Sequence, residues 1–343
     1  MLPVAIGTGS GLREASVTTG EVLRTLCAEC PLPARLSPYA DPVQEWLLGL
    51  LPELGLARDD AALRRLARGG FARYAGRLYP DATEADLRSL TALFTWFFLV
   101  DDACDGPGRL APEQIRALRN GTLALLHDGP RLRQAGLTGP LRRLLVLAWR
   151  EPRRRMPARW RLRFADAVAR HLDGTWQEAV NKEASRRPSV TEYVELRRAT
   201  SAAEVSYPLV EFVSGRLLPD PVYHHPLLRE VARTGNDLLS WYNDLASLDR
   251  DGATADGHNL VLAMQAEWGV SAAVAVDRAA ERWRESMRRF VALRAAVPSF
   301  GPALDEAVAD HLDGVAYAVR GTIDWTLESA RYPAAVGQPA SVS

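Results

Sequence analysis

The sequence is poor in residues that build covalent frameworks, and it carries no excess charge. Three cysteines in 343 residues are too few for a disulfide framework, and the pair Cys27 and Cys30 lacks the second pair that a structural zinc site needs. Basic and acidic residues both number 42, so no net charge would draw the chain to nucleic acid. No apolar run reaches the ~18 residues needed to cross a bilayer, and no signal peptide is visible. We therefore expect a reduced, cytoplasmic protein that neither binds nucleic acid nor spans a membrane.

Several catalytic motifs are also missing. The sequence contains no glycine-rich phosphate loop, no strand–turn–helix nucleophile and no histidine-rich metal motif, and its six histidines are scattered. Lys182 is the only lysine, so arginine supplies almost every positive charge. Arginine forms the better bidentate contacts with phosphate. No covalent nucleophile is expected.

Apolar residues recur at helical spacing along nearly the whole chain. From about residue 40 to 332 they follow the helix period, and no convincing alternating strand or internal repeat is present. Proline and glycine breaks divide this stretch into roughly ten or more helices of about 10–25 residues. We predict one all-α domain over residues 36–335. A flexible N-terminal arm at 1–35, rich in Gly, Thr, Ser and Pro, and a flexible tail at 336–343 would flank it.

Three aspartates stand where an aromatic run ends. Residues 96–100 read Trp-Phe-Phe-Leu-Val, and Asp101, Asp102 and Asp105 follow. In a helix, Asp101 and Asp105 would share a face about 6 Å apart along the axis, where like charges raise each other's pKa unless a cation lies between them. All-oxygen ligands suit Mg²⁺. The segment is therefore either a magnesium site or an ordinary acidic helix end that runs into the turn at 106–108.

A second polar stripe lies further along the chain. Asn243, Ser247 and Asp251 fall at successive turns of a helix, so an amide oxygen, a hydroxyl and a carboxylate share one face. Such an edge would chelate a hard divalent cation. Taken alone, a surface stripe that hydrogen-bonds its own backbone explains the pattern as well. The same spacing recurs in an earlier register, at Asn236, Ser240 and Asp244.

Two basic segments complete the pattern. Arg197 and Arg198 precede a stretch of small residues where a helix could bend. Arg331 and Tyr332 stand before a proline at the end of the last expected helix. Each pair alone is explained by an ordinary surface ion pair, so the pairs gain meaning only in combination with the acidic cluster and the polar stripe.

Taken together, these segments resemble the bacterial class I terpene cyclases. That family has an aspartate-rich DDxxD at the end of an aromatic helix, an arginine that senses diphosphate, an NDxxSxxxE stripe and a closing RY pair. In the family the sensor arginine stands 46 residues before the asparagine, and here 243 − 197 is also 46. This spacing selects Arg197 over Arg198 and Asn243 over Asn236. The likeness extends from about residue 40 to 335.

The resemblance implies a single-domain α-bundle of the class I terpenoid synthase type with a central active-site cavity. It implies a cluster of Mg²⁺, about three ions with Mn²⁺ as an alternative. The implied metal ligands are Asp101, Asp102, Asp105, Asn243, Ser247 and Asp251. The implied catalytic and diphosphate-binding residues are Arg197, Thr200, Ser201, Arg250, Arg331 and Tyr332, with Thr200 as the linker and Ser201 as the effector whose backbone carbonyl would face the leaving group. The implied aromatic walls are Phe94, Phe97, Phe98, Trp176 and Trp325.

Three positions depart from the family pattern. Asp251 stands where glutamate is usual, and its shorter side chain could weaken or shift one metal site. Arg250 stands where lysine is common and keeps a cation for the diphosphate. Ser201 replaces a frequent glycine and is still small.

By the resemblance, the chain would ionise and cyclise a linear prenyl diphosphate with Mg²⁺ and release diphosphate. Farnesyl diphosphate is favoured because it is the commonest substrate in the family, and geranylgeranyl diphosphate is the alternative. A prenyl-elongating synthase of the same fold would carry a second DDxxD and several lysines, which the sequence lacks. A non-catalytic helical binding protein is the alternative of another class. Because homodimers are frequent in the family, a homodimer is also a hypothesis here.

Overall fold

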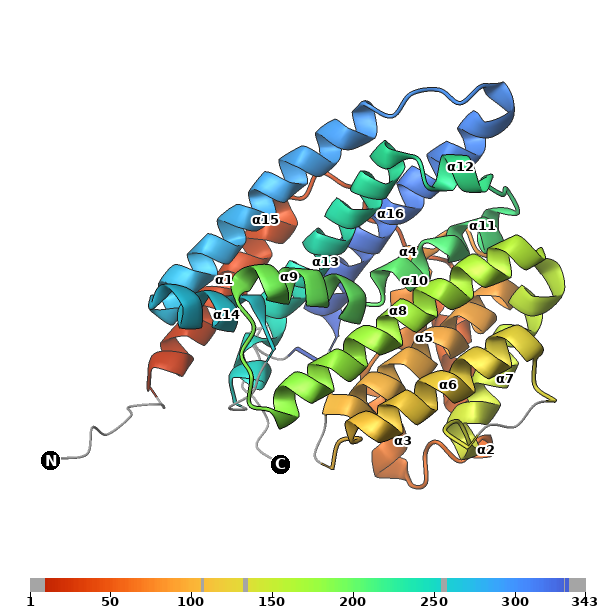
Figure 1. Ribbon diagram of the computed structural model, residues 1–343, viewed down its shortest axis with the longest axis horizontal. Coiled ribbons are helices and arrows are strands. Elements are labelled where there is room, and N and C mark those ends of the chain that lie inside the picture. Colours follow the sequence, from red (N-terminus) through yellow and green to blue (C-terminus); the bar gives the residue numbers. More distant parts are fainter. Residues whose placement is uncertain (1–9, 106–107, 132–134, 254–257, 330, 333–343) are drawn as a thin grey trace, which may run out of the picture.

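The computed structural model describes residues 10–105, 108–131, 135–253, 258–329 and 331–332. Within them the chain forms sixteen α-helices and no strand (Figure 1), which confirms the all-α prediction. No helix in these residues is long and apolar enough to cross a membrane. The helices are α1 (Ser10–Glu29), α2 (Ala40–Glu53), α3 (Asp60–Arg68), α4 (Phe71–Leu78), α5 (Glu84–Asp105), α6 (Pro112–Asp128), α7 (Gly139–Arg155), α8 (Ala158–Glu183), α9 (Val190–Thr200), α10 (Ala203–Ser206), α11 (Pro208–Ser214), α12 (Asp220–Tyr223), α13 (Pro226–Gly252), α14 (Leu260–Trp268), α15 (Ala272–Ala295) and α16 (Pro302–Glu328).

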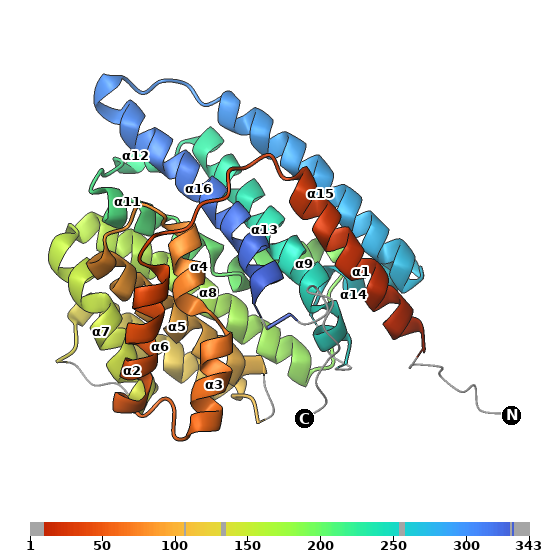
Figure 2. The ribbon, with the colours of Figure 1, turned by 180° about the vertical axis from the view of Figure 1, so that it is seen from behind.

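The helices form two groups that face each other across the middle of the molecule (Figures 1 and 2). One group contains α5 to α8, with α2 to α4 at its edge. The other contains α1, α13, α15 and α16, with α14 at its end. Helix α4 joins the groups because it contacts both α5 and α16, and α9 joins them through α8 and α13. The helices that carry the predicted site motifs therefore converge between the groups.

Helix α5 carries the aspartate cluster out of the core. Thr83 caps its start, where the hydroxyl accepts the backbone N–H of Asp86 at 3.2 Å. Its apolar residues cover several faces, and the helix packs against both α4 and α7, so Trp96 is fully buried. In the last turns the side chains of Asp101 and Asp105 keep 51% and 49% of their surface exposed. The acidic cluster therefore lies at the rim of the core.

Helix α13 brings the second polar stripe to the same region. Pro226 opens the helix, where a missing N–H costs no intrahelical hydrogen bond. Gly235 allows close packing on α16, because a Cβ there would lie 2.5 Å from Cγ1 of Val315. The helix ends at Gly252, so Asn243 to Asp251 occupy its last turns.

The N-terminal segment differs from the prediction. Residues 10–29 form α1, which contacts α13 and α15, rather than a flexible arm. Leu23 and Leu26 are buried, and the Tyr242 hydroxyl donates to the Leu23 carbonyl at 2.9 Å. The small polar residues of the segment hid this amphipathic spacing. The predicted arm at 1–9 and the predicted tail at 336–343 lie outside the described residues.

Candidate active site

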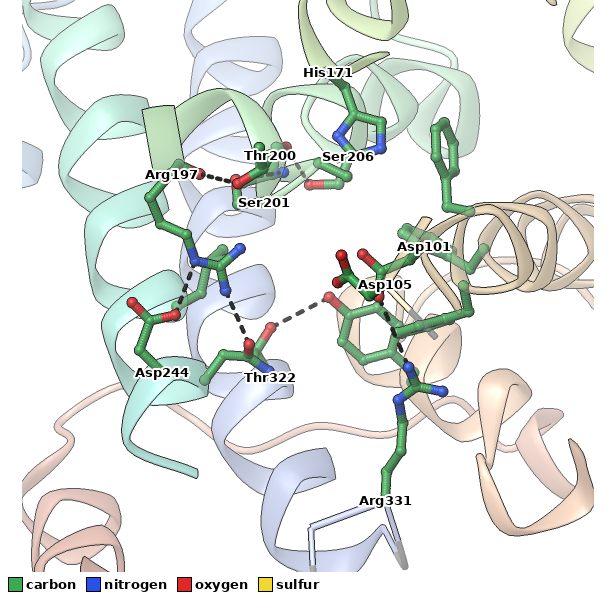
Figure 3. A pocket seen from close by; sticks show the side chains of 18 of the residues that line it. Asp101, Asp105, His171, Arg197, Thr200, Ser201, Ser206, Asp244, Thr322 and Arg331 are labelled. Carbon is green, nitrogen blue, oxygen red and sulfur yellow. Dashed lines mark hydrogen bonds and ion pairs between the residues drawn. The ribbon is translucent and has the colours of Figure 1, made fainter. Parts of the chain in front are cut away.

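The two helix groups enclose a cavity of about 160 Å³ (Figure 3). Residues of α4, α5, α8, α9, α10, α13 and α16 line it, together with residues that follow α9, α13 and α16. The predicted site residues at its surface are Phe94, Phe97, Phe98, Asp101, Asp105, Arg197, Thr200, Ser201, Asn243, Arg250, Asp251, Arg331 and Tyr332. Those that do not line it are Asp102, Trp176, Ser247 and Trp325.

Asp101 and Asp105 project from the end of α5 toward the cavity (Figure 3). The Lys182 ammonium lies 2.7 Å from Oδ1 of Asp105 and 2.7 Å from Oε1 of Glu178. The Asp101 carboxylate lies further from its cationic partner than Asp105 does, because Nη2 of Arg331 is 3.8 Å from its Oδ2. Withdrawal from bulk water and then the charge of Asp105 raise the pKa of Asp101 to about 7. A bound cation would therefore favour the ionised form of both carboxyls.

The Asp102 side chain contacts the segment that follows α16 instead. Nη2 of Arg331 lies 2.6 Å from its Oδ1, and the guanidinium carbon lies 5.2 Å from the centre of the Phe98 ring. The adjacent Tyr332 hydroxyl accepts a hydrogen bond from Nδ2 of Asn243 at 2.7 Å. The RY pair thus bridges α5 and α13 on the polar side of the cavity.

The stripe of α13 meets the cavity in the register that begins at Asn243. Asn243 and Asp251 line the cavity, whereas Ser247 is almost fully buried and donates to Oδ2 of Asp251 at 2.6 Å. Asn259 donates to the same carboxylate oxygen at 3.0 Å. The oxygen donors therefore share one face of the helix and are held there by hydrogen bonds.

Arg197 reaches from α9 to two neighbouring residues of α13. Its Nε donates to Oδ1 of Asp244 at 2.9 Å, and its Nη2 donates to Oδ1 of Asn243 at 2.9 Å. The Tyr193 hydroxyl donates to the other oxygen of Asp244 at 2.6 Å. Because Asp244 is 2% exposed, its carboxylate is a buried anchor that fixes the guanidinium at the cavity wall (Figure 3).

The chain bends between α9 and α10 at Ala202, whose φ of 58° lies in the left-handed region that a non-glycine residue rarely adopts. Thr200, Ser201 and Ala202 all line the cavity. The Ser201 hydroxyl donates to Oδ1 of Asn236 at 2.7 Å, and Ser240 donates to the same atom at 3.0 Å. Asn236 and Ser240 therefore hold the bend, and neither faces the cavity.

Sequence comparison identifies the family to which this site belongs. The family described as "Terpene synthase family 2, C-terminal metal binding" matches residues 92–289, more than half of the chain. The chain belongs to the terpene synthase family. It is a terpene cyclase, an enzyme of the lyase class, as the combined motifs predict.

Relatives match this terpene synthase over most of its length. (+)-T-muurolol synthase of Roseiflexus castenholzii is 31% identical over 310 residues, which cover 88% of this chain and 92% of the relative. Pentalenene synthase of Streptomyces exfoliatus is 31% identical over 312 residues, which cover 89% of this chain and 91% of the relative. The crystal structure of linalool/nerolidol synthase from Streptomyces clavuligerus is 25% identical and matches with a TM-score of 0.78, covering 87% of this chain and 99% of that one.

The residues of the terpene synthase fit the metal binding that its family's description gives. Within the described ranges, no three His, Cys, Asp or Glu side chains gather closely enough to hold a metal by themselves. Amide and hydroxyl oxygens add to the acidic donors, and Asn243 and Ser247 supply one each beside Asp251. With the carboxylates of Asp101 and Asp105 they would make an all-oxygen set, which is the kind of set that suits a hard divalent cation.

Two predicted wall residues of the terpene synthase lie away from the cavity. The Trp325 indole N–H donates to the Gly69 carbonyl at 2.9 Å, and its ring lies 5.3 Å from the Phe98 ring, behind the wall. Trp176 packs under the Arg116 guanidinium, 4.5 Å from the ring centre. Contrary to the prediction, neither side chain lines the cavity. The position of a tryptophan in the sequence does not reveal which face of its helix meets the ligand.

Some lining residues were not assigned to the site from the sequence. Tyr193 stands one helical turn before Arg197 and could have been found by spacing. Asp244 is the last residue of the earlier register that the spacing offered, and it lines the cavity as the partner of Arg197. Tyr74, whose hydroxyl lies 3.4 Å from Oγ1 of Thr322, belongs to no local motif. The same holds for His171 on α8, which also lines the cavity.

Proposed function

We propose that this enzyme ionises and cyclises farnesyl diphosphate with Mg²⁺ and releases diphosphate. The observation that carries the proposal is the convergence of oxygen donors from α5 and α13 with the guanidinium groups of Arg197, Arg250 and Arg331 around one cavity. Oxygen donors suit the metal, and guanidinium groups suit phosphate oxygens. Farnesyl diphosphate is favoured because the T-muurolol synthase relative is named as an enzyme that cyclises farnesyl diphosphate. Geranylgeranyl diphosphate is the alternative.

Two helices would share the metal. Asp101 and Asp105 on α5 would bind it from one side, and Asn243, Ser247 and Asp251 on α13 from the other. Mg²⁺ bound there supplies Lewis-acid stabilisation of the charge that develops on the leaving diphosphate. We assign Asp102 a supporting role, because its carboxylate is paired with Arg331 and does not line the cavity. Ser247 does not line the cavity either, but its hydroxyl contacts the lining carboxylate of Asp251.

Arginine side chains would bind the diphosphate directly. Arg197 is fixed by Asp244 and Arg331 by Asp102, so both guanidinium groups are oriented before the substrate arrives. Charge-assisted hydrogen bonds from such preorganised donors stabilise a developing oxyanion more than they stabilise the ground state. Tyr332 would add its hydroxyl, and Arg250, whose guanidinium lies 5.9 Å from the Tyr332 ring centre, would add a further charge.

The bend after α9 and the phenylalanine wall would act on the hydrocarbon. Thr200 and Ser201 line the cavity at the bend, where the Ser201 carbonyl would face the carbon that loses diphosphate. Phe94, Phe97 and Phe98 would shield the resulting cation from water, each with a cation–π attraction of up to about 2 kcal/mol where desolvated.

Chain elongation is disfavoured by the position of the only lysine. A second diphosphate would need further cations, but Lys182 already lies between Asp105 and Glu178. Burial opposes its charge, yet these two carboxylates raise its pKa above the ordinary value. Lys182 therefore compensates the acidic cluster and does not offer a second phosphate site.

The experiment is incubation of the purified protein with farnesyl diphosphate and Mg²⁺. We expect release of diphosphate together with a cyclic terpene detected by gas chromatography and mass spectrometry, both lost in EDTA and restored by excess Mg²⁺. A second sample contains geranylgeranyl diphosphate in place of farnesyl diphosphate, and a third contains farnesyl diphosphate together with isopentenyl diphosphate. A longer prenyl diphosphate in the last sample would indicate elongation, and no diphosphate release from any sample would overturn the proposal. Light scattering tests the expected homodimer.

A further inference from the structure

His171 lies in the cavity wall beside the phenylalanine residues of α5. His171 projects from α8 and lines the cavity, although it is only 6% exposed (Figure 3). Its ring meets the Phe97 ring edge-on, with centres 5.3 Å apart. Phe97 precedes Asp101 by one helical turn, about 6 Å along α5. His171 therefore lies at the level where the hydrocarbon chain of the proposed substrate would lie, rather than its diphosphate.

The two ring nitrogens of His171 have different environments. Nδ1 lies 3.2 Å from the carbonyl oxygen of Ala199. Because a carbonyl oxygen can only accept, this contact requires the proton on Nδ1 and leaves a lone pair on Nε2. Burial lowers the pKa of His171 to about 4, so the ring is neutral near pH 7. The cavity wall thus offers a neutral nitrogen base with a fixed tautomer.

Other proton acceptors at the cavity are committed elsewhere. Asp101, Asp105 and Asp251 are assigned to the metal, Asp244 holds Arg197 and Tyr193, and Glu178 pairs with Lys182. His258 also lines the cavity, but it stands beside Asn259, which contacts the Asp251 carboxylate on the polar side. Hydroxyl groups are much weaker bases than imidazole. Among the described residues of the wall, His171 is therefore the base next to the hydrocarbon region.

We propose that His171 ends the reaction by removing a proton from the last carbocation. Nε2 takes a proton from a carbon next to the cationic centre, the electrons of that C–H bond form the C=C bond, and the neutral ring becomes an imidazolium. Ala199 continues to accept from Nδ1 and thereby stabilises that cation. The proton then passes to the released diphosphate or to water when products leave. This inference rests on the proposed function, and it predicts an olefin as the main product.

Two substitutions remove the basic nitrogen of His171 and keep one of its packing or hydrogen-bond contacts. His171→Phe keeps a flat ring against Phe97 but has no nitrogen. His171→Asn keeps an N–H donor for Ala199 but has no basic nitrogen. His311→Phe is the matched control, because His311 is also buried and burial also lowers its pKa to about 4. Its ring packs against Tyr223, 5.3 Å between centres, and does not line the cavity.

Diphosphate release and product composition are measured in the same samples. We expect both His171 variants to release diphosphate at rates within about tenfold of the unsubstituted enzyme. The olefin that is the main product of the unsubstituted enzyme should fall by about tenfold or more as a share of the variants' products, in favour of alcohols or olefins from other cations. The His311→Phe profile should not change.

An unchanged olefin share in either folded His171 variant would overturn the proposal, as would an alcohol as the main product of the unsubstituted enzyme. Loss of diphosphate release in both His171 variants would assign the residue a structural role and would also overturn it. If the unsubstituted enzyme releases no diphosphate, the proposed function itself fails, and this result is distinct from the others.

Discussion

Nη2 of Arg331 lies 2.6 Å from Oδ1 of Asp102 and ties the end of the chain to the acidic end of α5. The neighbouring Tyr332 accepts a hydrogen bond from Asn243, so the same short segment also contacts α13. These contacts orient the arginine that we propose binds phosphate, between the two helices that we assign to the metal. Preorganised charge of this kind needs no rearrangement when the diphosphate leaves, and it therefore favours the transition state.

Removing the Arg331 charge should slow ionisation. We expect Arg331→Gln to lower kcat/KM for the prenyl diphosphate by about 100-fold, because one charge-assisted contact to the leaving group is lost. Arg331→Lys should restore only part of this, since an ammonium cannot form the bidentate contact. Steady-state diphosphate release measures both variants. Kinetics of Arg331→Gln equal to those of the unsubstituted enzyme would remove Arg331 from the site.

Each helix should be necessary for metal-dependent turnover. Asp101→Ala on α5 and Asn243→Ala on α13 should abolish or severely lower diphosphate release, because each removes an oxygen donor, while circular dichroism shows unchanged helicity. Asp173→Ala is the control, since it breaks only an exposed ion pair with Arg119, worth less than about 1 kcal/mol. Full activity of either donor variant at low Mg²⁺ would argue against the assignment.

Trp325 should matter for stability more than for product choice. Trp325→Phe removes the donor to the Gly69 carbonyl and part of the packing against Phe98, so we expect a loss of about 1–3 kcal/mol in the free energy of unfolding. Urea denaturation measures this loss. The product profile should change less than in Phe94→Leu, whose parent side chain lines the cavity. A changed product profile with an unchanged free energy of unfolding would instead indicate that Trp325 contacts the substrate.

The buried histidines should make the protein sensitive to acid. Burial lowers the pKa of His171 and His311 to about 4, whereas an unfolded chain has a histidine pKa of about 6.5. As pH falls, the unfolded state takes up these protons first, so this contribution to stability is complete above about pH 6.5 and is lost progressively toward pH 4. His311→Phe should therefore show a shallower loss of stability between pH 6.5 and 4, measured by urea denaturation. An identical slope would contradict this linkage.

The polar side of the cavity was predictable because its chemistry demands particular residue types at helical spacing. Asp101 and Asp105 share a face by their four-residue separation, and so do Asn243 and Asp251 across two such steps. The two clusters lie 142 residues apart in sequence (243 − 101), and only the family pattern indicated that they meet. The structure brings both to one cavity.

The hydrocarbon side was not predictable, because helix rotation and packing decide which side chains reach the cavity. His171 stands in no motif, and only the contact of α8 with α9 turns its Nδ1 toward Ala199. Trp176 carries an aromatic ring of the expected kind but packs against Arg116. Helix α1 was overlooked for a different reason, since its composition resembled an arm although Leu23 and Leu26 are spaced to pack on a bundle.

A structure from crystals of the enzyme grown with Mg²⁺ and inorganic diphosphate tests most directly whether α5 and α13 share a metal site. We expect Mg²⁺ bound by Asp101 or Asp105 on one side and by Asn243, Ser247 and Asp251 on the other, with the diphosphate in contact with Arg197 and Arg331. Mg²⁺ bound by only one of the two helices, or diphosphate bound outside the cavity, would contradict it.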